Sequence, residues 1–131
     1  MIRGGSCEFR WNLPYNFSEL AIVKITFWQD NYNGPTSDRT LPITKVREQC
    51  RVGSKPTELS VTLNQEETLR FTDKRKGKVQ LAAKTTTGIP IVSKEALFPV
   101  YPICNDSILD DTVIPAPDYD ELILLDGKNI I

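Results

Sequence analysis

The stretch that decides the fold is LSVTLNQEETLRFTDKRKGKVQLAA, which spans residues 59–83. Its first residues alternate between apolar and polar side chains, a period of two that predicts a strand with one buried face. Asn64 follows where a helix N-cap is expected. Glu66 and Glu67 stand in the first turn, where acidic side chains complement the helix dipole. The stretch therefore predicts a strand that runs directly into a capped helical turn.

The second half of this stretch predicts a return to the sheet. Leu69 and Phe71 are expected to close the helical turn onto the core. A basic turn follows at 74–78, where Gly77 provides backbone freedom, and residues 79–83 alternate again as a second strand.

Four further segments are rich in β-branched and aromatic residues or alternate as strands do, namely 7–12, 20–28, 41–47 and 91–101. In the second of them, Val23, Ile25 and Phe27 should face the core. Pro42 favours an edge position for the third, because proline cannot donate to a β-ladder. Loops are expected at 29–38 and 51–56. This succession of short strands and turns predicts an all-β fold, a single immunoglobulin-like β-sandwich with a short helical turn and an extended C-terminal arm.

The chain of 131 residues contains no histidine, and its three cysteines, Cys7, Cys50 and Cys104, are too far apart in sequence for metal-ligand spacing. We therefore expect no metal or other cofactor. The cysteines are interpreted as reduced and partly buried.

Candidate catalytic groups have simpler structural interpretations. The carboxylate pair Glu66–Glu67 fits a helix start, and the pair Asp110–Asp111 fits a solvated arm. Ser93 has no histidine to activate it, and its neighbour Lys94 lacks the sequence context of Ser–Lys hydrolases. We expect a protein that is not an enzyme.

Charge divides the chain into two parts. Residues 1–105 carry 15 Lys/Arg and 10 Asp/Glu, a balance of +5, whereas residues 106–131 carry one lysine and seven acids, a balance of −6. Pro115 and Pro117 prevent regular structure in the second part. We expect a β-sandwich domain at 1–105 and an extended acidic C-terminal arm at 106–131.

The arm ends in an apolar run that resembles a strand offered to an open sheet edge. The predicted partner-binding residues are this run with a nearby tyrosine and the cations of the basic turn: Leu122, Ile123, Leu124, Leu125, Tyr119, Lys74, Arg75, Lys76 and Lys78. The acids of the arm would steer it toward a basic surface of that kind. The sequence leaves open whether the arm docks on its own domain or on another chain.

Two other ligand classes, carbohydrate and nucleic acid, have candidate residues in the sequence. Trp11, Trp28 and Tyr32 lie around the first two strands and are a candidate sugar-stacking platform, although aromatic residues on strands are more often core or interface residues. The sequence argues against nucleic acid as a partner, because no aromatic residue is interleaved with the basic run and the sequence pI is about 5.5.

With these elements laid out, the chain resembles a group of small phage structural proteins that includes the N-terminal domain of siphophage upper-baseplate proteins. Its most distinctive matching motifs are the opening MIRGG and the LNQEE turn. The full set of matching residues is Met1–Gly5, Phe9, Leu13–Pro14, Phe17, 23–27, 61–71, 77–81, 86–88, Ser93, Val100 and 109–111. The chain departs from the pattern in its long 29–57 region and in its acidic arm.

The resemblance implies an immunoglobulin-like sandwich that serves as a non-enzymatic adaptor or decorating subunit of a tail, neck or capsid. It also implies localisation in the virion after synthesis in the host bacterial cytoplasm, with copies of itself and other virion proteins as partners. No apolar run approaches the roughly 20 residues that span a bilayer, so no membrane contact is expected. A carbohydrate-binding β-sandwich and an adhesin-like interaction module are the alternative functions.

Overall fold

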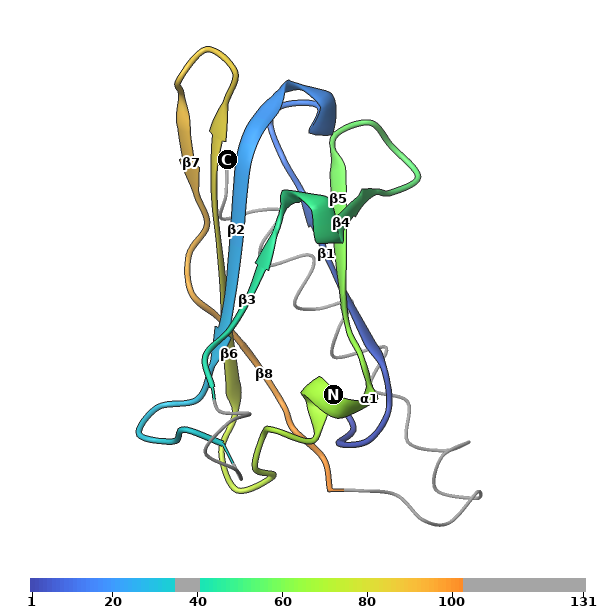
Figure 1. Cartoon of the computed structure of the whole chain (residues 1–131), viewed down its shortest axis with the longest axis vertical. Coiled ribbons are helices and arrows are strands. Elements are labelled where there is room, and N and C mark those ends of the chain that lie inside the picture. The colour runs from blue at the N-terminus through green and yellow to red at the C-terminus, as the bar shows by residue number, and fades with distance from the viewer. Residues whose placement is uncertain (35–40, 103–131) are drawn as a thin grey trace.

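The computed structural model describes residues 1–34 and 41–102 (Figure 1). Within this part of the chain, eight strands carry the fold, with one short α-helical turn and two 3₁₀ turns. In chain order the elements are β1 (Cys7–Asn12), η1 (Phe17–Glu19), β2 (Leu20–Trp28), β3 (Ile43–Val46), η2 (Arg47–Gln49), β4 (Cys50–Val52), β5 (Glu58–Leu63), α1 (Gln65–Thr68), β6 (Gly77–Thr85), β7 (Pro90–Val92) and β8 (Ala96–Phe98).

The strands form two antiparallel sheets, which confirms the all-β prediction. One sheet has three strands in the order β1-β5-β4. The other has the order β3-β2-β6-β7, with β8 pairing further along β6. The long strands β2 and β6 pair along almost their whole length, from Leu20 opposite Thr85 to Trp28 opposite Lys78.

The predicted strand at 20–28 is confirmed as β2, and its inward face is the one expected. Val23, Ile25 and Phe27 are at most 2% exposed. On β5, Leu59, Val61 and Leu63 are likewise buried, as the alternation in the deciding stretch predicts.

Aromatic side chains from both sheets meet in one core. The ring of Phe9 on β1 lies 5.0 Å from the ring of Phe27 on β2 and 5.0 Å from that of Phe98 on β8. Phe71 packs against Phe98 with the ring centroids 5.8 Å apart. Each buried side chain of this size contributes about 1.5–3 kcal/mol by leaving water, so this cluster holds the two sheets together.

The edges of the sheets follow from local chemistry. β3 lies at the edge of its sheet, as Pro42 predicted. The strand begins directly after this proline. The loop expected at 51–56 begins later than predicted, because residues 50–52 form edge strand β4. Cys50 and Val52 pair there with Val61 and Leu59, and an edge strand needs only one partner.

The single strand predicted at 91–101 is broken into β7 and β8. The break is at Ser93, whose hydroxyl accepts a hydrogen bond from the amide N–H of Leu81 at 2.9 Å. This side chain takes the place of a ladder carbonyl, so the chain shifts before Ala96 resumes pairing with β6.

Cys7 and Cys50 are free thiols that are buried at 4% and 8% exposure, which confirms the interpretation of these two cysteines. Burial raises the pKa of the Cys7 thiol far above its ordinary value and raises the pKa of Cys50 to about 11. Cys104 lies outside the described residues.

Candidate binding sites

The loop after β2 and the turn before β6 are joined by the buried side chain of Gln29. Its Nε2 donates to the carbonyls of Thr72 and Arg75 at 2.8 and 2.9 Å, and its Oε1 accepts from the Thr72 amide N–H at 2.9 Å. The Arg75 guanidinium in turn donates to the carbonyls of Asp30 and Asn31. The two connections are therefore held together as one unit.

The four cations predicted to bind a partner do not form one equivalent group. Arg75 is committed to the loop carbonyls, and Lys78 Nζ lies 2.6 Å from Asp30 Oδ2. The hydrogen bond in this ion pair is the main reason that the pKa of Asp30 is lowered and that of Lys78 is raised. Lys74 and Lys76 are exposed. Two of the four cations thus hold the fold at this end of the sheet.

The three aromatic residues proposed for sugar stacking are separated by the structure. Trp11 is fully buried between the sheets at 0% exposure, which removes it from any platform. Its position in the alternating strand β1 is in phase with Phe9, and this alone indicated a core residue. Trp28 and Tyr32 are partly exposed, and both line a pocket.

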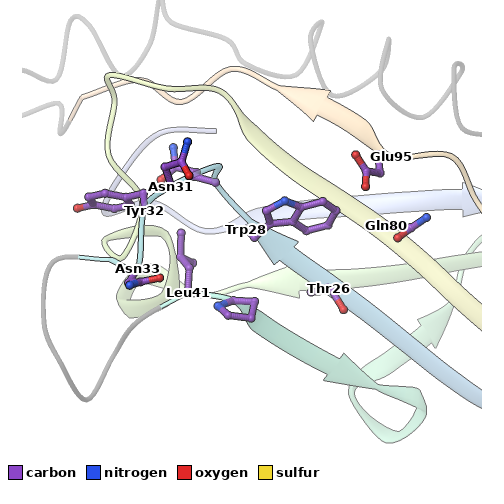
Figure 2. Close-up of a pocket in the computed structure, with 10 residues that line it drawn as sticks. Thr26, Trp28, Asn31, Tyr32, Asn33, Leu41, Gln80 and Glu95 are labelled. Carbon is purple, nitrogen blue, oxygen red and sulfur yellow. The ribbon is translucent and has the colours of Figure 1, made fainter.

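The pocket has a volume of about 420 Å³ and lies where the outer face of the five-stranded sheet meets the loop after β2 (Figure 2). Alternation along β2 and β6 directs Thr26, Trp28 and Gln80 outward, opposite the buried residues of these strands. The lining of the pocket consists of Thr26, Trp28, Gln29, Asn31, Tyr32, Asn33, Leu41, Pro42, Gln80 and Glu95.

A group of ion-paired side chains lies beside Trp28 at this pocket. Trp28 on β2 stands opposite Lys78 on β6, and Lys78 pairs with Asp30. Glu95 has its Oε1 4.0 Å from the same Lys78 Nζ. The Trp28 ring therefore lies next to charged groups that are already paired with one another.

A second surface feature is a cross-strand row on the outer face of the same sheet, with an exposed valine at each end. The register places Val46 beside Lys24, Lys24 beside Ala82, and Ala82 beside Val92. Val46 and Val92 are 42% and 59% exposed, and Ile22 in the neighbouring row is 58% exposed. The sequence did not reveal this row, because its members come from four strands whose register is set only in the fold.

The opening motif and the helical turn meet through Thr68. The amide N–H of Gly4 donates to Thr68 Oγ1 at 2.9 Å, and this hydroxyl donates to the carbonyl of Gly5 at 2.7 Å. Thr68 is fully buried, whereas Leu69 is 37% exposed and lies over Gly4. The prediction that Leu69 packs into the core is wrong. The short helix ends at Thr68, and Thr68 takes the inward position in place of Leu69. Phe71 is buried as predicted.

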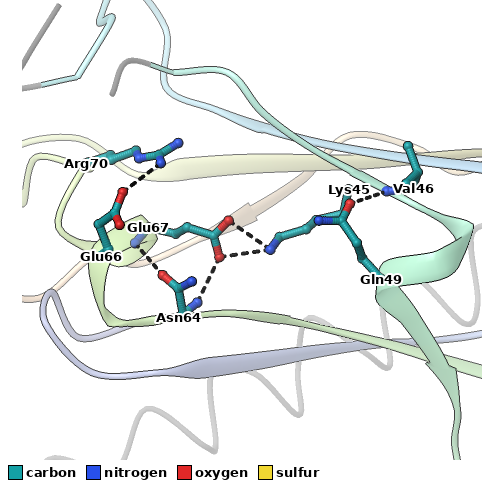
Figure 3. Close-up of polar contacts among 7 residues, drawn as sticks. All are labelled: Lys45, Val46, Gln49, Asn64, Glu66, Glu67 and Arg70. Atoms are coloured by element: carbon teal, nitrogen blue, oxygen red, sulfur yellow. Dashed lines mark hydrogen bonds and ion pairs between the residues drawn. The ribbon is translucent and has the colours of Figure 1, made fainter. Parts of the chain in front are cut away.

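The helical turn begins with the predicted Asn64 cap (Figure 3). Asn64 Oδ1 accepts from the Glu67 amide N–H at 2.8 Å, and Glu67 Oε1 accepts from the Asn64 amide N–H at 2.9 Å. Glu66 pairs instead with Arg70 one turn later, at 3.0 Å. The interpretation of these two carboxylates as a helix start is confirmed.

Some predicted features fall outside the described residues. These are Tyr119 and the run Leu122–Leu125, together with the arm that carries them. Among residues 1–34 and 41–102, no group of three or more His, Cys, Asp or Glu side chains is placed to hold a metal ion. No helix in the same part of the chain is long and apolar enough to cross a membrane.

No family model matches this chain, and no curated protein sequence matches it significantly.

Proposed function

We propose that this protein is a structural, non-enzymatic subunit of a bacteriophage virion. In this proposal it is an immunoglobulin-like β-sandwich that acts as an adaptor or decorating protein of a tail, neck or capsid. The proposal starts from the resemblance of the opening motif, Met1–Gly5, and of the LNQEE turn to small phage structural proteins.

The observation that carries the proposal is the bridge from Gly4 and Gly5 to Thr68. Thr68 directly follows the LNQEE turn and lies more than 60 residues after the opening motif, yet its buried hydroxyl bonds to the backbone of Gly4 and Gly5. General strand alternation does not require these two regions to touch. Their contact supports a resemblance that concerns one tertiary unit.

Three exposed apolar residues on the outer face of the five-stranded sheet, Ile22, Val46 and Val92, support an interaction role. Val46 and Val92 lie in one cross-strand row with Lys24 and Ala82 between them, and Ile22 lies in the neighbouring row, so all three are presented to a partner on the same face. In a virion the partner is a copy of the same subunit or a neighbouring structural protein, arranged by the symmetry of the particle.

Mass spectrometry of purified particles tests the proposal directly. We expect the protein at a stoichiometric copy number that is a multiple of the particle symmetry. Its absence from particles of a phage that encodes it, or presence only in the infected-cell lysate, would contradict the proposal.

A pair of variants tests the contact surface. Val92→Asp places a charge in the cross-strand row, and Thr62→Asp places one on an exposed position of the other sheet. Both variants should keep the melting temperature within a few degrees, since both sites are exposed. Only Val92→Asp should lose incorporation into particles, and equal incorporation of the two variants would remove the row from the interface.

A further inference from the structure

We propose that the pocket beside Trp28 binds a neutral saccharide unit. This inference is independent of virion membership, since it rests on the chemistry of the pocket alone. The pocket offers the aromatic face of Trp28, a second aromatic residue in Tyr32, and several uncharged polar side chains from the outer face of the sheet and from the loop after β2 (Figure 2).

The aromatic component fits a pyranose ring. One face of a pyranose presents C–H groups, which pack on the electron-rich face of an aromatic ring and leave the hydroxyls free to hydrogen-bond at the rim. Trp28 is partly exposed, and its place on β2 opposite Lys78 of β6 sets the indole in the lining of the pocket.

The polar component fits sugar hydroxyls, which both donate and accept hydrogen bonds. Thr26 provides a hydroxyl, Asn31 and Gln80 provide amides that donate and accept, and Glu95 provides a carboxylate that accepts. The amide of Gln80 is oriented by a bond from its Nε2 to the carbonyl of Ser93 at 3.1 Å. Figure 2 shows the Gln80 side chain on the same side of the sheet as Trp28 and Thr26.

The wall formed by the loop is also built in advance. Asn31 adopts a positive φ of 57°, a conformation that asparagine tolerates better than most residues, and its carbonyl is held by Arg75 at 2.9 Å. The carbonyl of Asn33 accepts from the amide N–H of Leu41 at 2.8 Å. Together with the Gln29 bonds, these contacts hold residues 29–33 at the pocket, and a site held in this way binds small polar ligands with less entropic loss.

Charge selects among ligand classes. Glu95 would repel a phosphate or a carboxylate at this position, and Lys78 is already paired with Asp30 at 2.6 Å. A cationic ligand would have to compete with Lys78 for Glu95. A neutral polyhydroxylated ligand meets neither penalty. The volume of about 420 Å³ lies toward the small end of ligand pockets, which suits a monosaccharide or disaccharide.

The experiment titrates the full-length protein with glucose, galactose, N-acetylglucosamine and lactose, and follows the Trp28 indole N–H by NMR. Trp11 is buried and serves as an internal control for general effects on the fold. We expect at least one of these sugars to cause saturable shifts at Trp28 with a Kd on the order of 1 mM, and no comparable shift at Trp11.

Variants locate the binding. Gln80→Ala should weaken sugar binding several-fold. Trp28→Ala should weaken it at least about tenfold, as expected for loss of the stacking face. In the Trp28 variant, binding is followed through the side-chain amides of Asn31 and Asn33. Val92→Ala, on the same outer face but outside the pocket lining, should bind as the wild type does. Gln80→Ala keeps the proposal testable if Trp28→Ala fails to fold.

Three results overturn the proposal. The first is no saturable shift at Trp28 with any of the four sugars up to about 50 mM. The second is undiminished affinity in both pocket variants. The third is saturation by inorganic phosphate or by the peptide Gly-Lys-Gly at concentrations where no sugar binds.

Discussion

Lys45 points inward from β3 and is held by Glu67 in the helical turn that follows β5, so an ion pair connects the two sheets (Figure 3). Lys45 Nζ lies 2.9 Å from Glu67 Oε1 and 2.8 Å from Oε2. The two side chains are only 9% and 13% exposed. The same carboxylate caps the turn, so Glu67 stabilises the helix start and also neutralises a nearly buried ammonium group.

Neutralising Glu67 should therefore be far more destabilising than neutralising its neighbour. Glu67→Gln keeps a carbonyl oxygen for the cap but leaves the Lys45 charge without a counter-ion, and we expect a loss of about 3 kcal/mol in the free energy of unfolding. Glu66→Gln is the matched control, because the carboxylate of Glu66 is 49% exposed and should contribute less than about 1 kcal/mol. Urea denaturation of both variants measures the difference, and equal losses would show that the Lys45 pair is not buried as described.

Thr68→Val should separate the hydroxyl bridge from simple packing. Valine has nearly the same shape but cannot bond to Gly4 and Gly5, which leaves two backbone groups without their partner. We expect a loss of about 1–3 kcal/mol and faster hydrogen exchange at the Gly4 amide. Thr62→Val, at an exposed position of β5, is the control and should change stability little. Unchanged Gly4 exchange in Thr68→Val would dismiss the bridge.

Gly77→Ala should be destabilising for a steric reason. A Cβ atom at Gly77 would lie 2.2 Å from Cζ of Phe98, inside the aromatic core. The Phe98 ring would have to shift away from Phe9 and Phe71, so we expect a loss of about 1–3 kcal/mol, as for other overpacked cores. At Gly53 the nearest atom to an added Cβ belongs to the flexible Glu58 side chain, so Gly53→Ala should be better tolerated. Thermal unfolding of the two alanine variants compares them.

The buried thiols predict a loss of stability at alkaline pH. The Cys50 thiol has a pKa of about 11 in the fold against an ordinary 9.0, so the folded state keeps its proton where the unfolded state has released it. The unfolded state binds fewer protons in this window, and the free energy of unfolding should fall as pH rises from 9.0 toward about 11. The slope is up to roughly 1.4 kcal/mol per pH unit for each such thiol.

Stability measured between pH 8 and 10 in wild type and Cys50→Ala tests this expectation, since lysines and tyrosines contribute equally to both proteins. The variant should show the shallower decline. Thiol labelling adds a second check in a Cys104→Ser background, where Cys7 and Cys50 should react only after unfolding. Parallel pH curves together with rapid labelling of the native protein would place Cys50 at the surface.

Local patterns were sufficient to predict much of the fold. The strand at 20–28 and the Asn64 cap depend on neighbouring residues only, so alternation and capping chemistry located both. Long-range placement was less accessible. Lys45 is in phase with the buried Ile43, but a lysine can point inward there only because Glu67, 22 residues later, provides its counter-ion. Leu69 was misplaced because the length of the helical turn is set by the Thr68 contact with the opening motif.

The candidate sites, too, were only partly predictable from neighbouring residues. The sequence grouped Trp28 and Tyr32 with Trp11, since nearness in sequence does not distinguish the two faces of a sheet. Glu95 and Gln80 reach the pocket through the pairing of β6 with its neighbours, and no local pattern marks them.

The side-chain amide of Gln29 both donates to the carbonyl of Thr72 and accepts from its amide N–H. A paired residue on a neighbouring antiparallel strand would make the same two bonds with its backbone. Only a side chain of this length with both a donor and an acceptor can fill that role. Gln29 and the chain around Thr72 are consequently unable to change independently. An insertion or deletion beside Gln29 or beside Thr72 would break these two hydrogen bonds, so related sequences should keep the spacing around both residues while their exposed lysines vary freely.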